Sequence, residues 1–102
     1  MNTDDLIKAV EGWAQARGIN NMQMQGLKFF EEAGEICTEI THGRLDDPEG
    51  KLKDALGDTM VTLIIWADLL GYSLSDCLEA AYEEIADREG TLINGCFVKN
   101  NQ

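Results

Sequence analysis

The chain has 102 residues, a length that allows one domain with a modest core. Its hydrophobic fraction of 44% is too high for a disordered chain. Its 19 acidic residues outnumber 8 lysines and arginines, and the net charge of −11 argues against binding to duplex nucleic acid or to an anionic membrane surface. The three cysteines, Cys37, Cys77 and Cys96, show no C-x-x-C spacing, so we expect reduced packing residues rather than disulfides or a zinc site.

Amphipathic patterns separated by glycines predict helices over about residues 4–17, 22–41, 49–70 and 73–89. The last predicted helix has an apolar face, on which we expect Tyr82 to lie in the core; the face is made by Leu74, Cys77, Leu78, Ala81, Tyr82 and Ile85. The tail, residues 90–102, carries an Asn-Gly turn signal followed by Cys96-Phe97-Val98, and we expect it to be irregular with at most a short extended piece. The sequence therefore predicts a single all-α domain over residues 1–102.

No segment predicts export or insertion into a membrane. The N-terminus has no basic region followed by an apolar stretch, as a signal peptide would. The longest apolar stretch, from Met60 to Leu70, is too short to cross a bilayer. We therefore expect a cytoplasmic protein.

Two acidic motifs of the form acid-x-x-Gly-acid stand out, Glu31–Glu35 in the second predicted helix and Asp54–Asp58 in the third. Like charges stacked at helical spacing destabilise a helix by a few tenths of a kcal/mol, so they are either solvated or hold a cation. For the second helix alone, a solvated acidic face is the simpler interpretation. The third helix is apolar nearly all round, which predicts that Asp54 and Asp58 lie on a buried face and need a positive partner.

Glycine precedes the second acid of each motif, at Gly34 and Gly57. A glycine inside a helix costs about 0.5–1 kcal/mol relative to alanine, which suggests that the backbones approach closely there. If the two helices pair at these glycines, four or five carboxylates converge. Oxygen-only sites of this kind suit Mg²⁺ or Mn²⁺, and Mg²⁺ often shares its coordination with substrate phosphates.

These motifs occur in a particular order along most of the chain, from about Trp13 to Lys99. The segments are Lys28-Phe29-Phe30-Glu31-Glu32-Ala33-Gly34-Glu35, Lys53-Asp54-Ala55-Leu56-Gly57-Asp58-Thr59, Arg88-Glu89-Gly90 and Asn94-Gly95-Cys96-Phe97-Val98-Lys99. Together they resemble the MazG-like all-α nucleoside triphosphate pyrophosphohydrolases, and the short form carried by phages is the nearest match. The resemblance implies a four-helix fold whose helices pack into a bundle across a homo-oligomer interface, in a homodimer or homotetramer.

The resemblance also implies a ligand set for Mg²⁺, with Mn²⁺ as a possible substitute. Glu32 and Glu35 match the first pair of family acids, and Asp58 matches the last. The remaining family glutamate falls at Ala55, a departure from the pattern, and Asp54 is the available substitute one helical turn before Asp58.

The implied reaction is hydrolysis of an NTP or dNTP to the monophosphate and pyrophosphate, in the host cytoplasm if the protein belongs to a phage. Glu31 or Glu35 would orient or deprotonate the attacking water. Substrate contacts would come from Lys28, Arg88, Asn94 and Lys99. Two alternatives stay open: a metal- and nucleotide-binding oligomer of the same fold with little turnover, and a purely structural helical dimer that binds no metal.

Overall fold

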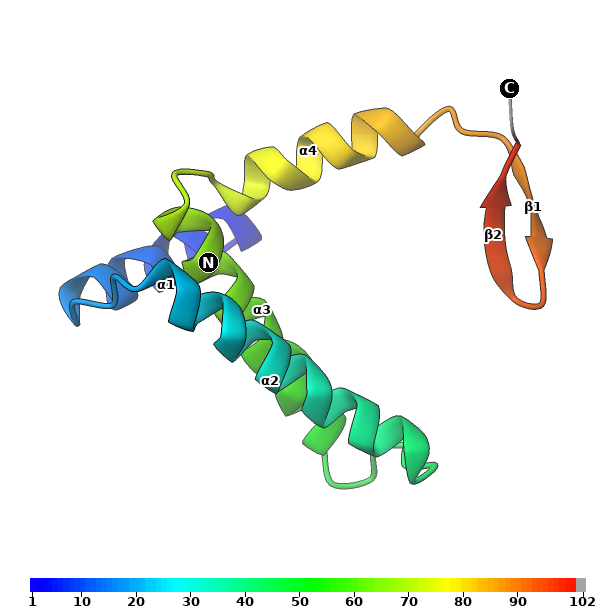
Figure 1. Cartoon of the computed structure of the whole chain (residues 1–102), viewed down its shortest axis with the longest axis horizontal. Coiled ribbons are helices and arrows are strands. Elements are labelled where there is room, and N and C mark those ends of the chain that lie inside the picture. Colours follow the sequence, from blue (N-terminus) through cyan, green and yellow to red (C-terminus); the bar gives the residue numbers. More distant parts are fainter. Residues whose placement is uncertain (101–102) are drawn as a thin grey trace.

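The computed structural model describes residues 1–100 and is mostly helical, as predicted. Four helices precede a two-stranded hairpin (Figure 1). The elements are α1 (Thr3–Ala16), α2 (Met22–Thr41), α3 (Lys51–Leu69), α4 (Leu74–Ile85), β1 (Gly90–Ile93) and β2 (Cys96–Lys99). The first three helices begin and end within two residues of the predicted bounds. The last is shorter than predicted because it ends at Ile85 rather than near residue 89.

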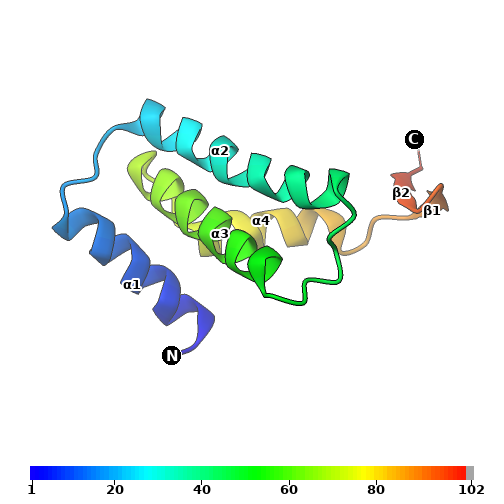
Figure 2. The same cartoon turned by 90° about the horizontal axis from the view of Figure 1, so that it is seen from below.

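The most extensive helix–helix packing in the fold is between α2 and α3, which run antiparallel along most of their length (Figure 2). Gly26 gives α2 its closest approach, because a Cβ there would lie 2.8 Å from the Trp66 ring of α3. The indole also lies 6.0 Å from the ring centroid of Phe29 and 6.3 Å from that of Phe30. The absent glycine side chain therefore makes room for the largest aromatic contact of the core.

The loop between α2 and α3 is held by two carboxylates. Glu39 near the end of α2 accepts hydrogen bonds of 2.7 and 3.2 Å from the guanidinium of Arg44. Asp47 accepts hydrogen bonds from the backbone N–H groups of Leu52 and Lys53, at 2.7 and 3.0 Å. Asp47 thereby satisfies N–H groups that the N-cap residue, a glycine without a side chain, leaves free.

Helix α1 packs against the C-terminal part of α3. Ile7 and Ala14 of α1 are buried together with Ile64 of α3, and the Gln15 side chain donates a 2.9 Å hydrogen bond to Asp68. No described large side chain is completely buried, so the core of a single chain is thin.

Helix α4 leaves this three-helix unit at its first turn. Ser75 donates a 2.7 Å hydrogen bond to Asp4 of α1. Every residue in the range 76–100 is exposed. The expectation that Tyr82 lies in the core is wrong for the single chain, since Tyr82 is 63% exposed, and Leu78 on the same apolar face is 69% exposed. The helix projects away from α1–α3 instead of completing a bundle (Figure 1).

Residues 90–99 form an antiparallel hairpin, so the tail is more regular than predicted, and the short extended piece after the turn is one of two paired strands. Residues 101–102 lie outside the described part. Gly90 pairs with Lys99, and Leu92 with Phe97. Asn94 and Gly95 form the turn with positive φ angles of 52° and 79°, the conformation that Asn-Gly sequences favour in two-residue hairpins. The turn signal was present in the sequence, but the flanking strands are too short to show alternation.

The resulting shape is open. The Cα radius of gyration is 16.3 Å, whereas a compact domain of this length has about 13 Å.

All three cysteines are exposed thiols, so the expectation that they pack in the interior is wrong. Within residues 1–100 no single helix is long and apolar enough to cross a membrane, although α3 and α4 taken together, with a 99° bend between them, meet that criterion by length and composition alone.

Candidate acidic site on the second helix

Three carboxylates gather on α2. Glu31, Glu32 and Glu35 each offer an oxygen atom, and these oxygens lie within 4.8 Å of one another. Glu31 and Glu35 are exposed, whereas the Glu32 side chain is only 14% exposed. Lys28 is the nearby cation, with its Nζ 3.7 Å from Oε1 of Glu32 one helical turn away.

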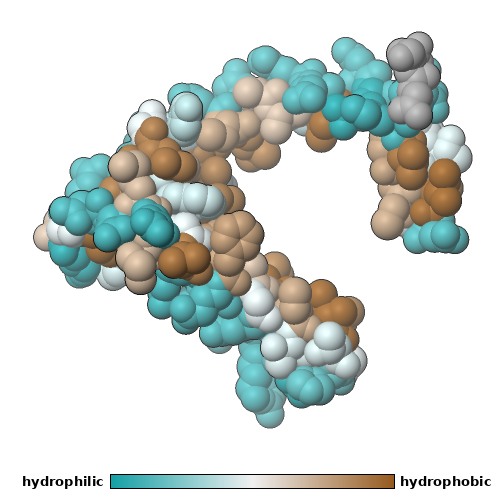
Figure 3. All heavy atoms as spheres, viewed as in Figure 1, coloured by the Kyte–Doolittle hydropathy of each residue, from teal (hydrophilic) through white to brown (hydrophobic). Residues whose placement is uncertain are grey.

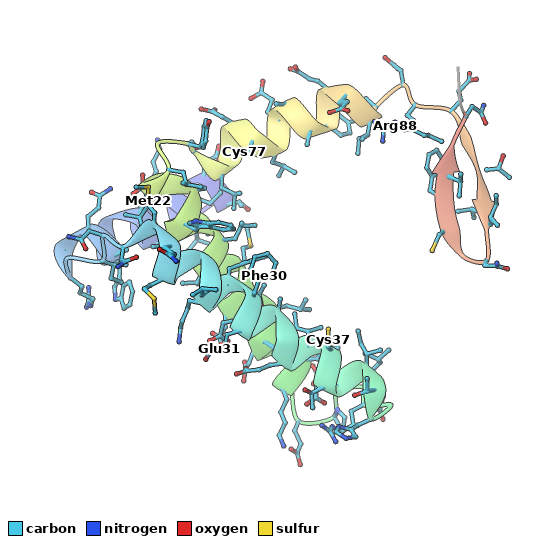
Figure 4. The ribbon with its side chains drawn as sticks, viewed as in Figure 1. Met22, Phe30, Glu31, Cys37, Cys77 and Arg88 are labelled. Carbon is cyan, nitrogen blue, oxygen red and sulfur yellow. The ribbon has the colours of Figure 1, made fainter. Side chains whose placement is uncertain are left out.

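The packing of α2 explains this arrangement. Gly26 and Phe29 face α3, and residues three and seven positions beyond Phe29 continue the same stripe. Glu32 therefore lies at the edge of the contact, which accounts for its partial burial, and Glu31 and Glu35 lie further out. Figure 4 shows Glu31 on one side of α2, with Phe30 and Cys37 on the other.

The acids of α3 are placed differently from the prediction. Asp54 and Asp58 are exposed, and Ala55 between them is 8% exposed. The predicted buried face is wrong because α2 covers one side of α3 and α1 covers only its C-terminal part, which leaves the N-terminal half open to solvent. Neither aspartate belongs to the group of oxygens within 4.8 Å. The predicted convergence of four or five carboxylates is therefore reduced to the three glutamates of α2.

The predicted role of the two motif glycines is also wrong within one chain. A Cβ at Gly34 or at Gly57 would meet no atom within 4 Å, so neither position is where α2 and α3 approach closely. That position is Gly26, eight residues before Gly34. The sequence carried one signal for it, since Gly26 stands one turn before Phe30 and next to the aromatic segment that packs on α3.

On α3, helical spacing still places one aspartate near the glutamates. Ala55 and Thr62 are buried on the side of α3 that faces α2. At 100° per residue Asp58 falls beside this stripe, on the same flank of the antiparallel pair as Glu32. Asp54 falls one turn earlier and further from α2. Asp58 is thus the α3 acid best placed to join the glutamates.

The other candidate substrate contacts lie far from the acids. Arg88 follows α4 and forms an ion pair with Glu84 at 3.3 Å. Lys99 lines a shallow hollow with Arg88 at the junction of α4 and the hairpin, and Asn94 occupies the hairpin turn. Figure 4 places Arg88 and Glu31 in well-separated parts of the chain. Of the four predicted substrate contacts, a single chain brings only Lys28 close to the glutamates of α2.

The donor set is chemically suited to a hard divalent cation. Carboxylate oxygens are the ligands that Mg²⁺ and Mn²⁺ prefer, and the exposure of Glu31 and Glu35 leaves room for water or phosphate oxygens. Lys28 neutralises only one of the three charges. We call Glu31, Glu32 and Glu35 the acidic cluster.

Comparison with known proteins gives one informative match. The chain is 35% identical over 65 residues to an uncharacterised 18.2 kDa protein from the rep–hol intergenic region of Haemophilus phage HP1 (strain HP1c1). The match covers 61% of this chain, which spans 37% of the length of the phage protein. No protein-family model matches the chain, and no solved structure matches it.

Proposed function

We propose that the chain is a Mg²⁺-dependent nucleoside triphosphate pyrophosphohydrolase that converts an NTP or dNTP to the monophosphate and pyrophosphate. The observation that carries this proposal is the acidic cluster, three carboxylates within 4.8 Å beside Lys28. It lies in the segment whose sequence resembles the MazG-like enzymes. The relative in a phage is compatible with a function in the cytoplasm of an infected host.

The residues have distinct tasks in this reaction. Glu32 and Glu35, with Asp58 from α3, would hold the cation, and Asp54 is the remaining candidate ligand. The bound cation would supply charge neutralisation at the triphosphate oxygens. Lys28 would add a positive charge for the same phosphates, at the edge of the cluster.

The chemical step requires a base. A water molecule attacks the α-phosphorus, the bond from that phosphorus to the oxygen bridging to the β-phosphate breaks, and pyrophosphate leaves. A carboxylate of Glu31 or Glu35 takes the proton of the water. Both side chains are exposed and therefore open to an approaching substrate.

A second function is favoured by one observation. The family glutamate falls at Ala55, which is small and 8% exposed, so the matched ligand set of Glu32, Glu35 and Asp58 has one carboxylate fewer than the family pattern. A chain with an incomplete ligand set could bind the cation and nucleotide with little turnover. We therefore keep a metal- and nucleotide-binding oligomer as the alternative.

A substrate panel tests the proposal. Each of the eight common NTPs and dNTPs is incubated with the protein and assayed for pyrophosphate, with Mg²⁺, with Mn²⁺ and with neither. We expect cation-dependent release from at least one nucleotide. Glu35→Gln should lower that rate by about 100-fold or more, the usual contribution of a positioned base or ligand. Glu83→Gln, an exposed carboxylate of α4, is the matched control and should keep the rate.

The outcomes separate the alternatives. Circular dichroism must show the same helical content in both variants, so that a lost rate reflects chemistry. Heat of nucleotide binding without pyrophosphate would favour the binding protein. An unchanged melting temperature with Mg²⁺ and a non-hydrolysable dNTP, together with no product, would reject both, because a ligand that binds the folded state must stabilise it.

A further inference from the structure

An apolar groove runs along the contact between α1 and α3. Its walls are Leu6, Ala9, Val10 and Trp13 of α1 and Val61 of α3, and its volume is about 400 Å³. No wall residue carries a charge, and Leu6 and Trp13 are 50% and 48% exposed. From residue 6 to residue 13 an α-helix makes about two turns. An exposed apolar groove of this length is typical of a site that binds another molecule.

The groove lies on a different side of the molecule from the surface that faces α4. Figure 3 shows apolar atoms along the inner side of the open shape, on α4, on the hairpin and on the helices opposite them. Ile7 and Met60 border the hollow at the start of α4. Leu6 and Val61 of the groove are each one residue away, and one residue turns an α-helix by about 100°. The implied homo-oligomer, which would cover α4, therefore does not account for the groove.

Acidic residues stand on both rims of the groove. On α3, Asp54 and Asp58 precede Val61 by seven and three residues, so the three side chains share one row of the helix. On α1, Asp5 precedes Ala9 by four residues and stands on the opposite rim. All three aspartates are exposed. In a chain of net charge −11, these rims attract a positively charged partner.

The charges give the groove a direction. Helices α1 and α3 run the same way, since their C-terminal parts meet at the hydrogen bond from Gln15 to Asp68. The three rim aspartates therefore lie at the N-terminal end of the groove. Arg17 marks the other end, where its guanidinium lies 4.3 Å from the ring centroid of Trp13. A partner should thus place its basic residues toward the end that carries the aspartates.

Shape and charge together select the occupant. An amphipathic helix fills a groove of this kind with apolar residues at positions i, i+3, i+4 and i+7. Lysines or arginines beside that apolar stripe would meet the rim aspartates. Helix α4 of this chain also has an exposed apolar face, but it contains four acids and no lysine or arginine. Nucleic acid and anionic membranes are repelled by the same aspartates.

We propose that the groove between α1 and α3 binds a basic amphipathic helix of a partner protein. The apolar stripe of that helix packs on Leu6, Trp13 and Val61, and its lysines or arginines pair with the rim aspartates. The inference rests on the groove and the charge of its rims, and it is independent of the proposed activity.

Fluorescence anisotropy with designed peptides tests the proposal on the full chain. The probe is a labelled Leu/Lys peptide of about 18 residues, or about five helical turns, with its leucines on one side. One control peptide has glutamate in place of every lysine, and another has the same composition with leucines on all sides. The titrations contain EDTA and no Mg²⁺, because Asp58 is also a candidate cation ligand. The result therefore does not depend on nucleotide hydrolysis.

We expect only the amphipathic Leu/Lys peptide to bind at micromolar concentration. Its affinity should fall when NaCl is raised from about 0.01 M to about 0.15 M, which shortens the screening length from about 30 Å to about 8 Å. Ala9→Arg places a long basic side chain in the groove and should weaken binding about tenfold or more. Ala80→Arg changes the net charge equally on the exposed helix α4 and should leave the affinity within about twofold.

Three results would overturn the proposal. The first is no binding of the Leu/Lys peptide, as expected if a second copy of the chain fills the groove. The second is equal binding of the Leu/Lys peptide and either control peptide, because the site would then not read an amphipathic basic helix. The third is an equal effect of Ala9→Arg and Ala80→Arg, which would mean attraction by net charge alone. Circular dichroism confirms that both variants keep their helical content.

Discussion

The α2–α3 pair and the arm, as we call residues 74–99 with α4 and the hairpin, are both built from amphipathic segments. Only the α2–α3 pair finds its partner inside the described chain, since every residue in the range 76–100 is exposed. Trp66 of α3 is half-buried and packs against Phe29, Phe30 and the backbone at Gly26. Tyr82 of α4, on an equally apolar helix face, is 63% exposed. The two regions differ in how the chain connects them. A nine-residue loop brings α3 back along α2, whereas α4 projects away from α1–α3 and no other described helix lies along it (Figure 1).

This comparison shows what helical periodicity does and does not determine. A repeating apolar stripe predicts that a helix exists and which side it buries. It does not indicate whether the covering surface belongs to the same chain. The α2–α3 pair should therefore respond to substitutions at any protein concentration, and the arm should respond through association.

The largest expected effect contrasts the two aromatic residues. Trp66→Ala should lower the free energy of unfolding by about 3 kcal/mol at every protein concentration, because it removes the main contact between α2 and α3. Tyr82→Ala should cost little in dilute protein and progressively more as the concentration rises, because we expect this exposed side chain to be covered in the homodimer that the family resemblance implies. Urea denaturation followed by circular dichroism at several protein concentrations measures both.

The control for these two variants is the same concentration series measured on the wild-type protein. Wild-type protein must become more stable with concentration if a second copy covers the exposed apolar face of α4. Equal losses for Trp66→Ala and Tyr82→Ala in the most dilute sample would mean that the arm packs within its own chain.

A smaller effect on stability should distinguish Gly26, which packs against Trp66, from Gly34, which has no close neighbour. In Gly26→Ala the new Cβ would lie 2.8 Å from the Trp66 ring, which Phe29 and Phe30 hold in place. Overpacking of this kind costs about 1–3 kcal/mol, of which better helix propensity returns part. In Gly34→Ala the Cβ meets nothing within 4 Å, so α2 should gain about 0.5–1 kcal/mol.

Melting temperatures of the two glycine variants give the answer directly. Gly26→Ala should melt below the wild type and Gly34→Ala above it. If Gly34→Ala melts lower, this glycine has a close neighbour that a single chain lacks, and the acidic side of α2 would also belong to an interface.

Much of the helical fold could be predicted from sequence because glycines and apolar spacing mark the helices locally. The hairpin could not be predicted from sequence, because each strand has only four residues and the Asn94-Gly95 turn is the only clear signal for it. The acidic cluster on α2 followed from spacing within one helix. The exposure of Asp54 and Asp58 could not be predicted in this way, because it depends on how little of α3 the neighbouring helices cover.

The smallest expected effect concerns the loop that makes the α2–α3 pair possible. The hydrogen bond from Arg44 holds the pKa of Glu39 below its ordinary value of 4.5, and the hydrogen bond to Glu39 raises that of Arg44. A carboxyl whose pKa is lower in the folded than in the unfolded chain stabilises the fold above the unfolded value and loses that contribution as the pH falls through the folded value. Below pH 4.5 the wild type should therefore lose slightly more stability than Arg44→Gln, in which Glu39 has no guanidinium partner. Melting curves between pH 7 and pH 3 would show the two proteins converging in acid, and parallel curves would mean that this partly exposed pair does not contribute to closing the loop.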